Sequence, residues 1–297
     1  MKSNPNTPLP WGTRTFIMGI INVTPNSFSG DGVMQHDNSL DAAVKQAALF
    51  LRNGADILDV GGESTRPGSE PVNEKEELAR VIPVIEAITN AFPEVRISVD
   101  TYKASVARKA LEAGAKWVND VWGLRADPEL GSVVADYQVP VILMHNRIKP
   151  GSAELETRLG GRYVGVDYDD LIHDIGKELL KSVSLAHRAG IQDEKIILDP
   201  GIGFGKTVSQ NLELLDRLDE IKALGYPLLV GPSRKSFIGY TLDSPPDERV
   251  EGTAAAVAIG IDRGADIIRV HDVNVMTKVA RMTDAIVRRK LADAEDA

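Results

Sequence analysis

The sequence contains no cysteine, so disulfides, thiolate zinc sites and cysteine nucleophiles are all excluded. No apolar run reaches the about 18 residues that a membrane helix needs, and the first residues, MKSNPNTPLP, lack the apolar stretch of a signal peptide. Basic residues are outnumbered by acidic ones: the sequence has 34 Lys and Arg and 43 Asp and Glu, which gives a net charge of -9. An acidic balance argues against binding nucleic acid through its phosphates. We therefore expect a cytoplasmic protein that binds neither membrane nor nucleic acid.

Short apolar, β-rich runs alternate with longer segments of helical period from residue 16 onward, as in repeated βα units around a parallel sheet. The pattern predicts eight strands, at 16–22, 56–61, 96–100, 117–120, 140–145, 195–199, 227–231 and 266–271. It predicts helices near 39–53, 74–91, 102–114, 128–136, 168–189, 208–223, 247–263 and 273–292. An α/β fold with a closed (β/α)8 TIM barrel follows, and an open doubly wound sheet is the alternative.

No linker divides the chain, so we expect one barrel domain over 16–292, a flexible N-terminal arm over 1–15 and a tail over 293–297. The longest irregular segment, 146–170, follows the fifth strand and is expected to be either a lid or a tolerated insertion.

The stretch LDPGIGFGKT, 198–207, looks at first like a phosphate-binding loop. Pro200 stands where the P-loop needs its first glycine, and Gly201, Gly203 and Gly205 do not have the G-x-G-x-x-G spacing. Another reason must explain why Asp199 precedes three glycines.

Polar residues follow every predicted strand, where the loops of a barrel build its active site. Any one of them could instead cap a helix or a turn. They are Asn22, Asp59, Asp100, Asn119, Asp120, His145, Asn146, Asp199, Ser233, Arg234, Lys235, Ser236, Arg269 and His271.

Two groups among them indicate chemistry. Arg269 and His271 share a strand face and can both donate to an anion. Asp100, Asn119, Asp199 and Lys235 can point into one cup and bond the edge of a planar nitrogen heterocycle, as Asn and Asp bond base edges. For Asp59 and Asp120 we expect supporting roles, and for His173 and His187 solvated positions on a charged helix.

The motifs GIINVTPNSFS, DVGGESTRPG, SVDT, LMH, LDPGIGFGKT, GPSRKSFIG, EGTAAA and RVHDV occur in this order over about 16–275. In this the chain resembles the dihydropteroate synthases. The resemblance implies a TIM-barrel transferase of folate biosynthesis that joins 6-hydroxymethyl-7,8-dihydropterin pyrophosphate to p-aminobenzoate. It further implies a homodimer, a Mg²⁺ cofactor and a target of sulfonamides, which imitate p-aminobenzoate.

The resemblance also assigns site residues, named by their positions in this chain. Pterin contacts are implied for Asp100, Asn119, Met144, Asp199 and Lys235. Contacts to p-aminobenzoate are implied for Phe28, Thr65, Arg66, Pro67 and Ser236. Pyrophosphate contacts are implied for Asn22, Thr65, Arg269 and His271, with the metal held through Asn22. The catalytic groups are then Asp100, Lys235, Arg269 and His271.

The first loop departs from the family pattern, because Asn26 replaces an aspartate and Gly30-Asp31 shifts another acid by one position. We expect Asp31 to compensate in part for metal binding and rate. The loop after the fifth strand is also longer than usual. Two alternatives remain open: a methyltetrahydrofolate-dependent methyltransferase, and a related protein that binds pterins without turnover.

Overall fold

The computed structural model describes residues 9–23, 36–64, 69–148, 153–156 and 158–289, without the side chains of 36–39. Its central sheet has eight parallel strands in the order β8-β5-β4-β3-β2-β1-β10-β9, and a parallel bridge between Leu198 and Leu228 joins its two edges. The strands are β1 (Phe16–Asn22), β2 (Ile57–Gly61), β3 (Arg96–Asp100), β4 (Trp117–Asp120), β5 (Val141–Met144), β8 (Ile196–Asp199), β9 (Leu229–Val230) and β10 (Ile267–Val270). The predicted closed barrel is thereby confirmed.

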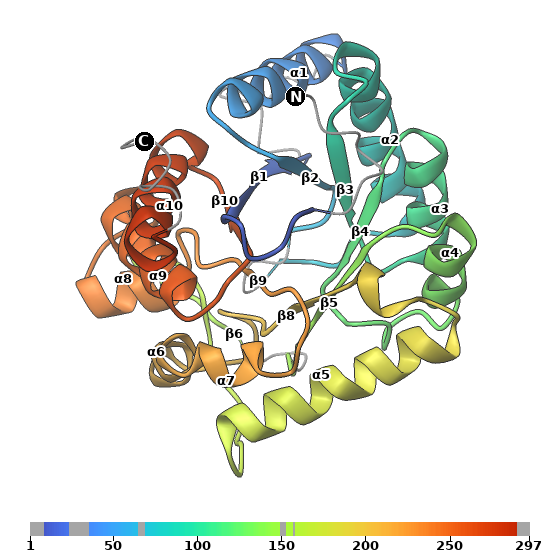
Figure 1. Cartoon of the computed structure of the whole chain (residues 1–297). Helices are drawn as coiled ribbons and strands as arrows, with labels where there is room; N and C mark the ends of the chain where they lie inside the picture. The colour runs from blue at the N-terminus through green and yellow to red at the C-terminus, as the bar shows by residue number, and fades with distance from the viewer. Residues whose placement is uncertain (1–8, 24–35, 65–68, 149–152, 157, 290–297) are drawn as a thin grey trace.

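Helices surround this barrel (Figure 1). They are α1 (His36–Arg52), α2 (Glu74–Ala91), α3 (Ala104–Glu112), α4 (Leu130–Tyr137), α5 (Leu171–Arg188), α6 (Val208–Asp216), α7 (Leu218–Lys222), α8 (Ser236–Leu242), α9 (Val250–Asp262) and α10 (Val273–Val287). The predicted helix over 208–223 is divided into α6 and α7, and α8 was not predicted. No helix in the described part of the chain is long and apolar enough to cross a membrane.

Side chains alternate along each strand between the helical layer and the barrel interior. On β1, Ile17 and Ile21 pack in the large cluster under the helices, whereas Phe16 and Met18 belong to the interior cluster. That interior cluster also holds one residue from each of six other strands: Ile57, Trp117, Ile142, Ile197, Leu229 and Ile267.

The same alternation aims the site residues inward. Asp59, Asn119, Met144, Asp199 and Arg269 each lie two positions after an interior apolar residue, so they share its face of the strand. A slip of one residue in any strand would turn its site residue outward against the helices.

The expected flexible arm over 1–15 is corrected by the structure from residue 9 onward. Leu9 is buried in the interior cluster, and Trp11 meets Phe16 edge to face at 5.6 Å between ring centroids. The Thr15 amide and hydroxyl donate to the Asp284 carboxylate at 2.7 and 2.9 Å. These residues are ordered because their apolar side chains close the amino-terminal end of the barrel; the rest of the arm and the tail lie outside the described residues.

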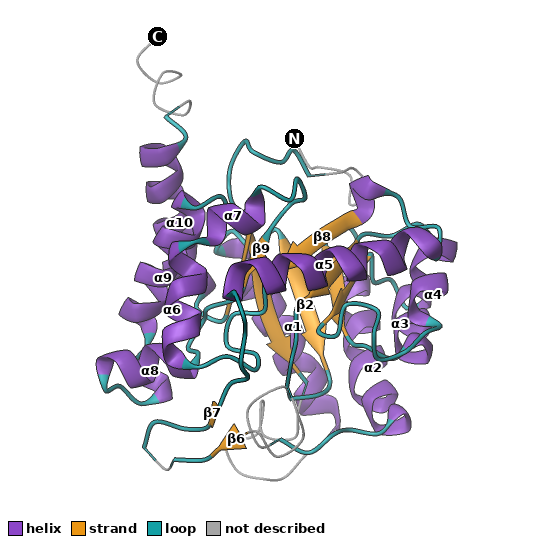
Figure 2. Cartoon of the chain, turned by 90° about the horizontal axis from the view of Figure 1, so that it is seen from below, coloured by secondary structure: helices purple, strands orange, loops and turns teal. Residues whose placement is uncertain are grey.

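A small antiparallel hairpin, β6 (Ala153–Glu154) and β7 (Arg162–Tyr163), interrupts the predicted irregular segment between β5 and α5. Figure 2 shows it beyond the carboxyl ends of the barrel strands, where the site residues lie.

Candidate active site

A cavity of about 1120 Å³ opens at the carboxyl ends of the strands. Six residues predicted for the site line it: Asn22, Asp100, Lys235, Ser236, Arg269 and His271. The residues that were assigned to a shared site from the sequence therefore lie around one cavity. Asn26, Phe28, Gly30, Asp31, Thr65, Arg66 and Pro67 lie outside the described residues.

Arg269 is held between two carboxylates at the floor of the cavity. Its Nε donates to Asp59 Oδ2 and its Nη2 to Asp100 Oδ2, both at 2.6 Å. Burial opposes the charged guanidinium, but the two carboxylates prevail and raise its pKa. Asn119 Nδ2 donates to the same Asp59 oxygen at 3.0 Å. Asp59 is therefore a supporting residue, as expected, but one that aligns two predicted site residues at once.

Asp100, one of the two partners of Arg269, also lines the cavity. Burial raises the pKa of its carboxyl to about 7, and the positive charge of Arg269 acts in the opposite direction. Protonation of this group near neutral pH would remove a negative charge next to Arg269.

Lys235 and Asp199 form the other side of the predicted cup. Burial lowers the pKa of Lys235 to about 7, and the Asp199 carboxylate opposes this shift. The Lys235 ammonium donates to the Ile202 carbonyl and lies 4.3 Å from the centroid of the Phe204 ring. Burial also raises the pKa of Asp199, while Lys235 and the Gly201 amide, which donates at 2.7 Å, act against that shift.

The glycines after Asp199 allow the loop to pack closely against its neighbours. Gly201 has φ +72°, and a Cβ there would collide with the carbonyl oxygen of His145. A Cβ on Gly203 would collide with the stem of Lys235. Glycine at these positions thus allows the loop to lie directly against β5 and the cavity lysine.

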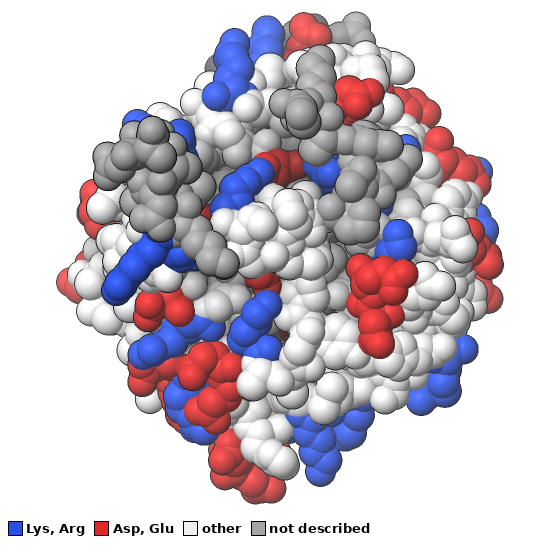
Figure 3. Space-filling view, in the orientation of Figure 1, with Lys and Arg blue, Asp and Glu red and all other residues white. Residues whose placement is uncertain are grey.

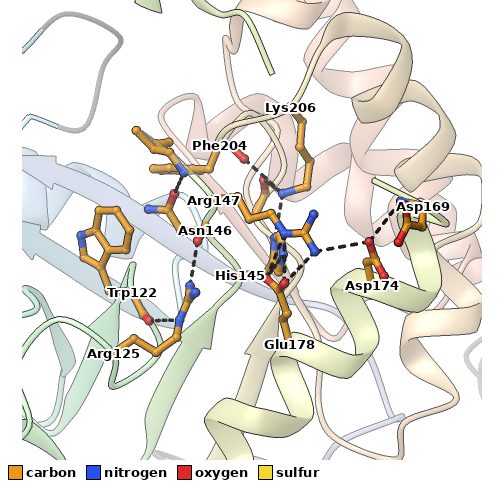
Figure 4. A network of polar contacts seen from close by, with 12 residues as sticks. Trp122, Arg125, His145, Asn146, Arg147, Asp169, Asp174, Glu178, Phe204 and Lys206 are labelled. Carbon is orange, nitrogen blue, oxygen red and sulfur yellow. Dashed lines mark hydrogen bonds and ion pairs between the residues drawn. The ribbon is translucent and has the colours of Figure 1, made fainter. Parts of the chain in front are cut away.

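A buried polar network anchors this glycine loop (Figure 4). Lys206 Nζ donates to the carbonyls of Gly201 and Phe204 at 2.9 and 3.2 Å, and lies 3.1 Å from His145 Nδ1. His145 Nε2 lies 3.0 Å from Glu178 Oε2. Burial lowers the pKa of His145 to about 4, so its neutral ring accepts from Lys206 at Nδ1 and donates to Glu178 at Nε2.

Lys206 had no assigned role from the sequence, although it lies in the stretch singled out there. Burial lowers its pKa to about 7. One signal in the sequence could have drawn attention to Lys206. It follows three glycines and directly precedes Thr207, the N-cap of α6. His145 comes one position after Met144 and therefore faces α5 and not the cavity.

Three further predicted positions have local partners. Ser233 Oγ lies 3.0 Å from His271 Nδ1 and accepts from the His271 amide at 3.2 Å, which fixes the imidazole at the cavity wall. Arg234 also lines the cavity, but its guanidinium is paired with Asp272 at 2.5 Å. Asp120 accepts from the amides of Trp122 and Leu124 at 2.8 and 2.6 Å, so it stabilises a turn, as expected.

Charged side chains of both signs are interspersed on the face shown in Figure 3. Among the coloured residues there, Lys and Arg form no continuous patch of the kind that a phosphate backbone requires.

Comparison with known proteins matches residues 18–271 to the model of a family described as pterin binding enzyme. The chain belongs to the pterin-binding enzyme family. Within the family it is 50% identical to a dihydropteroate synthase of Clostridium beijerinckii, over 94% of this chain and 96% of that protein. It is 44% identical to the dihydropteroate synthase of Escherichia coli, over 92% of each chain.

Solved structures of the family agree with this assignment. A Clostridium difficile dihydropteroate synthase crystallised in the presence of pteroic acid matches with a TM-score of 0.85 and 48% identity, over 94% of this chain and 99% of that one. The Xanthomonas albilineans enzyme in complex with 7,8-dihydropteroate matches with a TM-score of 0.80 and 38% identity, over 92% and 94%. The resemblance found in the motifs is thus confirmed: this family member groups with the dihydropteroate synthases.

Proposed function

We propose that this protein is a dihydropteroate synthase, which condenses 6-hydroxymethyl-7,8-dihydropterin pyrophosphate with p-aminobenzoate to give 7,8-dihydropteroate and pyrophosphate. One observation carries the proposal: in a pterin-binding enzyme, Asp100 and Lys235 of the predicted cup and the pair Arg269 and His271 line one cavity. The cup suits the polar edge of a pterin, and the pair suits the leaving pyrophosphate.

The pterin end of the cavity is assigned by donor and acceptor type. Asp199 accepts from the 2-amino group and ring N–H, and Asn119 bonds the same edge. Lys235 donates to the ring carbonyl and nitrogen. Met144 is buried against Val121 and Phe204 and forms the apolar surface under the ring. Such contacts would match the polar edge and the apolar face of the ring.

The reaction breaks the bond between the pterin methylene carbon and the pyrophosphate oxygen, and the electron pair leaves with pyrophosphate. The aryl amine lone pair then forms the new C–N bond, and the nitrogen releases a proton to solvent. Positive charge that develops on the methylene and ring is stabilised by the Asp100 carboxylate. Negative charge that builds on pyrophosphate is stabilised by Arg269 and His271.

The aryl amine is assigned to Phe28, Thr65, Arg66, Pro67 and Ser236, with Thr65 also toward pyrophosphate. Of these, Ser236 is described and lines the cavity at the start of α8. Its hydroxyl is a donor suited to the carboxylate of p-aminobenzoate.

Magnesium belongs to the proposal through Asn22. No group of three or more His, Cys, Asp or Glu that could hold a metal occurs among the described residues. That finding fits magnesium, which keeps several waters and is held by few protein oxygens together with substrate phosphates. The amide oxygen of Asn22, at the cavity wall, would supply one such ligand. When bound, the ion would neutralise charge on the pyrophosphate.

A cytoplasmic location and sensitivity to sulfonamides stay predictions, and a homodimer through the outer helices is part of the proposal. Exposed apolar side chains on α9 and α10 support the dimer.

The test measures pyrophosphate release and dihydropteroate formation with and without p-aminobenzoate. Product that requires both substrates is expected. Pterin binding without product would favour a non-catalytic pterin-binding protein, and methyl transfer from methyltetrahydrofolate would favour a methyltransferase. Asp199→Ala should abolish pterin binding in calorimetry, whereas Asp216→Ala, which removes a surface carboxylate with 74% exposure, should leave it unchanged.

A further inference from the structure

The turns after β9 and β10 carry residues that act on different parts of one substrate. Lys235 and Ser236 follow β9, and Arg269 and His271 lie at the end of β10 and just beyond it. All four line one cavity. In the proposed function Lys235 binds the pterin ring, and Arg269 with His271 binds the pyrophosphate of the same molecule. The relative position of the two turns therefore decides whether one substrate molecule can contact both groups at once.

The sheet anchors the turn after β10 more extensively than the turn after β9. The ladder between the two strands pairs two residues of each, and its last pair is Val230 with Ile268. On its other side, β10 continues beside β1 through Arg269 and Val270. The position of residues 231–235 relative to β10 therefore depends largely on side-chain contacts.

Side-chain links join the two turns. Ser233 Oγ lies 3.0 Å from His271 Nδ1 and accepts from the His271 amide at 3.2 Å. One residue further along each turn, Arg234 donates from Nε and Nη2 to the two carboxylate oxygens of Asp272, at 2.8 and 2.5 Å. A guanidinium that bonds a carboxylate through two N–H groups fixes orientation as well as distance. The second link therefore determines how the turn after β9 is oriented relative to β10.

The carboxylate of Asp272 is used for this link and not for its own helix. Asp272 is the N-cap residue of α10, a position where an aspartate side chain commonly accepts from an amide in the first helical turn. Its side chain makes no such capping bond. Both of its oxygens accept from Arg234 instead. The ion pair thus replaces the usual local contact of an N-cap aspartate.

The backbone of Arg234 has a conformation that residues with a side chain seldom adopt. Its φ is +56°, in the left-handed region. Its amide donates to Thr253 Oγ1 at 3.0 Å, and its carbonyl accepts from Arg249 Nη1 at 3.0 Å. Thr253 and Arg249 are 0% and 2% exposed, and Thr253 belongs to the motif EGTAAA, which the proposed reaction does not use. Buried partners on both backbone groups therefore maintain the turn that leads into Lys235 and Ser236.

We propose that Arg234 is a positioning residue, which through Asp272 sets the distance and orientation between Lys235 and the pyrophosphate-binding pair. This rests on the proposed function, in which one substrate molecule contacts both. A weaker link allows the turn after β9 to shift relative to β10. Each part of the site then still binds its own fragment of the substrate, but the intact substrate no longer engages both parts at once.

The experiment measures three Kd values by calorimetry without p-aminobenzoate. The ligands are 6-hydroxymethyl-7,8-dihydropterin, inorganic pyrophosphate with magnesium, and the pterin pyrophosphate with magnesium. Asp272→Asn keeps the shape of the side chain and removes its charge. The Kd values of the two fragments should stay within about twofold of wild type, whereas the Kd of the intact substrate should rise about tenfold, or about 1.4 kcal/mol. The stoichiometry reports the folded fraction, so unfolded protein does not imitate this result.

Two further variants complete the comparison. Arg234→Lys keeps the cation but lacks the planar fork, so it should also raise the Kd of the intact substrate, by about three- to tenfold. It carries the test if Asp272→Asn does not fold. Asp216→Asn makes the same substitution in another ion pair, with Arg263, where the Asp216 side chain is 74% exposed. This control should leave all three Kd values unchanged.

The outcomes separate two failures. An unchanged Kd of the intact substrate in a folded Asp272→Asn or Arg234→Lys variant would overturn the positioning role. A fragment whose Kd rises as much as that of the intact substrate would overturn it too, because the effect would then lie within one part of the site. If the wild-type protein forms no dihydropteroate, the proposed function is rejected, and the inference with it.

Discussion

Burial shifts the pKa values of two cavity residues toward 7, one from below and one from above. It raises the pKa of Asp100 to about 7 and lowers the pKa of Lys235 to about 7. Both groups act in the proposed reaction in their charged forms, Asp100 as a carboxylate and Lys235 as a donor. The free protein therefore has both groups charged only in a narrow range of pH.

A bell-shaped pH dependence of kcat/KM for the pterin substrate follows. The value should fall below about pH 7 as Asp100 is protonated and fall above about pH 7 as Lys235 loses its proton, because kcat/KM reports on the free enzyme. Lys235→Arg keeps its charge over this range, so it should remove the alkaline fall even at a lower maximum rate. Steady-state assays between about pH 5.5 and 9 measure this. A flat profile across that range would contradict the assignment.

The elements that the sequence predicts best are those with a local signal. The bounds of β1, β3 and β4 agree with the predicted strands 16–22, 96–100 and 117–120, because each is a buried run between turn residues. The hairpin β6–β7 pairs only two residues per strand, and α8 has no side-chain cap at its start. Both depend on tertiary contacts such as those of Tyr240 and Arg249, which no local pattern reveals.

The same limit applies to the site. The alternation of βα units predicts which residues lie at the strand ends. It does not predict which side chains they contact. Asp59 and Arg269 are 210 positions apart in the chain, and only closure of the barrel brings them together. Lys206 and His145 meet through the packing of the glycine loop on β5, which likewise depends on the folded barrel.

The glycine loop gives a prediction at the scale of an element. Lys206→Met removes the donor to His145 Nδ1 and to two carbonyls, and each buried acceptor left without a partner costs about 1–3 kcal/mol. We expect a lower free energy of unfolding in urea and an increase of about tenfold or more in the pterin Kd, since Phe204 and the contact of Ile202 with Lys235 lie on this loop. Lys181→Met on the exposed face of α5 is the control.

The sign of the pH effect on this variant follows from the lowered pKa of Lys206. The unfolded chain binds its proton up to about pH 10.5, whereas the folded chain releases it near pH 7, so this residue adds stability as pH rises between those values. The difference in unfolding free energy between wild type and Lys206→Met should therefore widen from about pH 7 to about pH 9. A constant difference would show that Lys206 stays charged in the fold.

At the scale of the whole molecule, the outer surface of α10 and the adjacent α9 exposes several large apolar side chains. Val275, Met282 and Ile286 on α10 are 40%, 64% and 57% exposed, and Ile259 on the adjacent α9 is 46% exposed. Their spacing along α10 places the three on one side of the helix. Exposed apolar side chains gathered on one side of a helix support the proposed homodimer.

Charged side chains introduced at this surface should separate the protomers without abolishing activity. In Met282→Glu with Ile286→Glu, two carboxylates would be buried in the interface without partners, so we expect monomers in sedimentation velocity at concentrations where the wild type is a dimer. Leu49→Glu, at a 47% exposed position on α1, should leave the wild-type assembly unchanged. Turnover per chain should persist in the monomer, because the described cavity is lined by residues of a single barrel. A wild-type protein that sediments as a monomer would refute the dimer, whereas a monomeric variant that loses activity would show that each site depends on the neighbouring protomer.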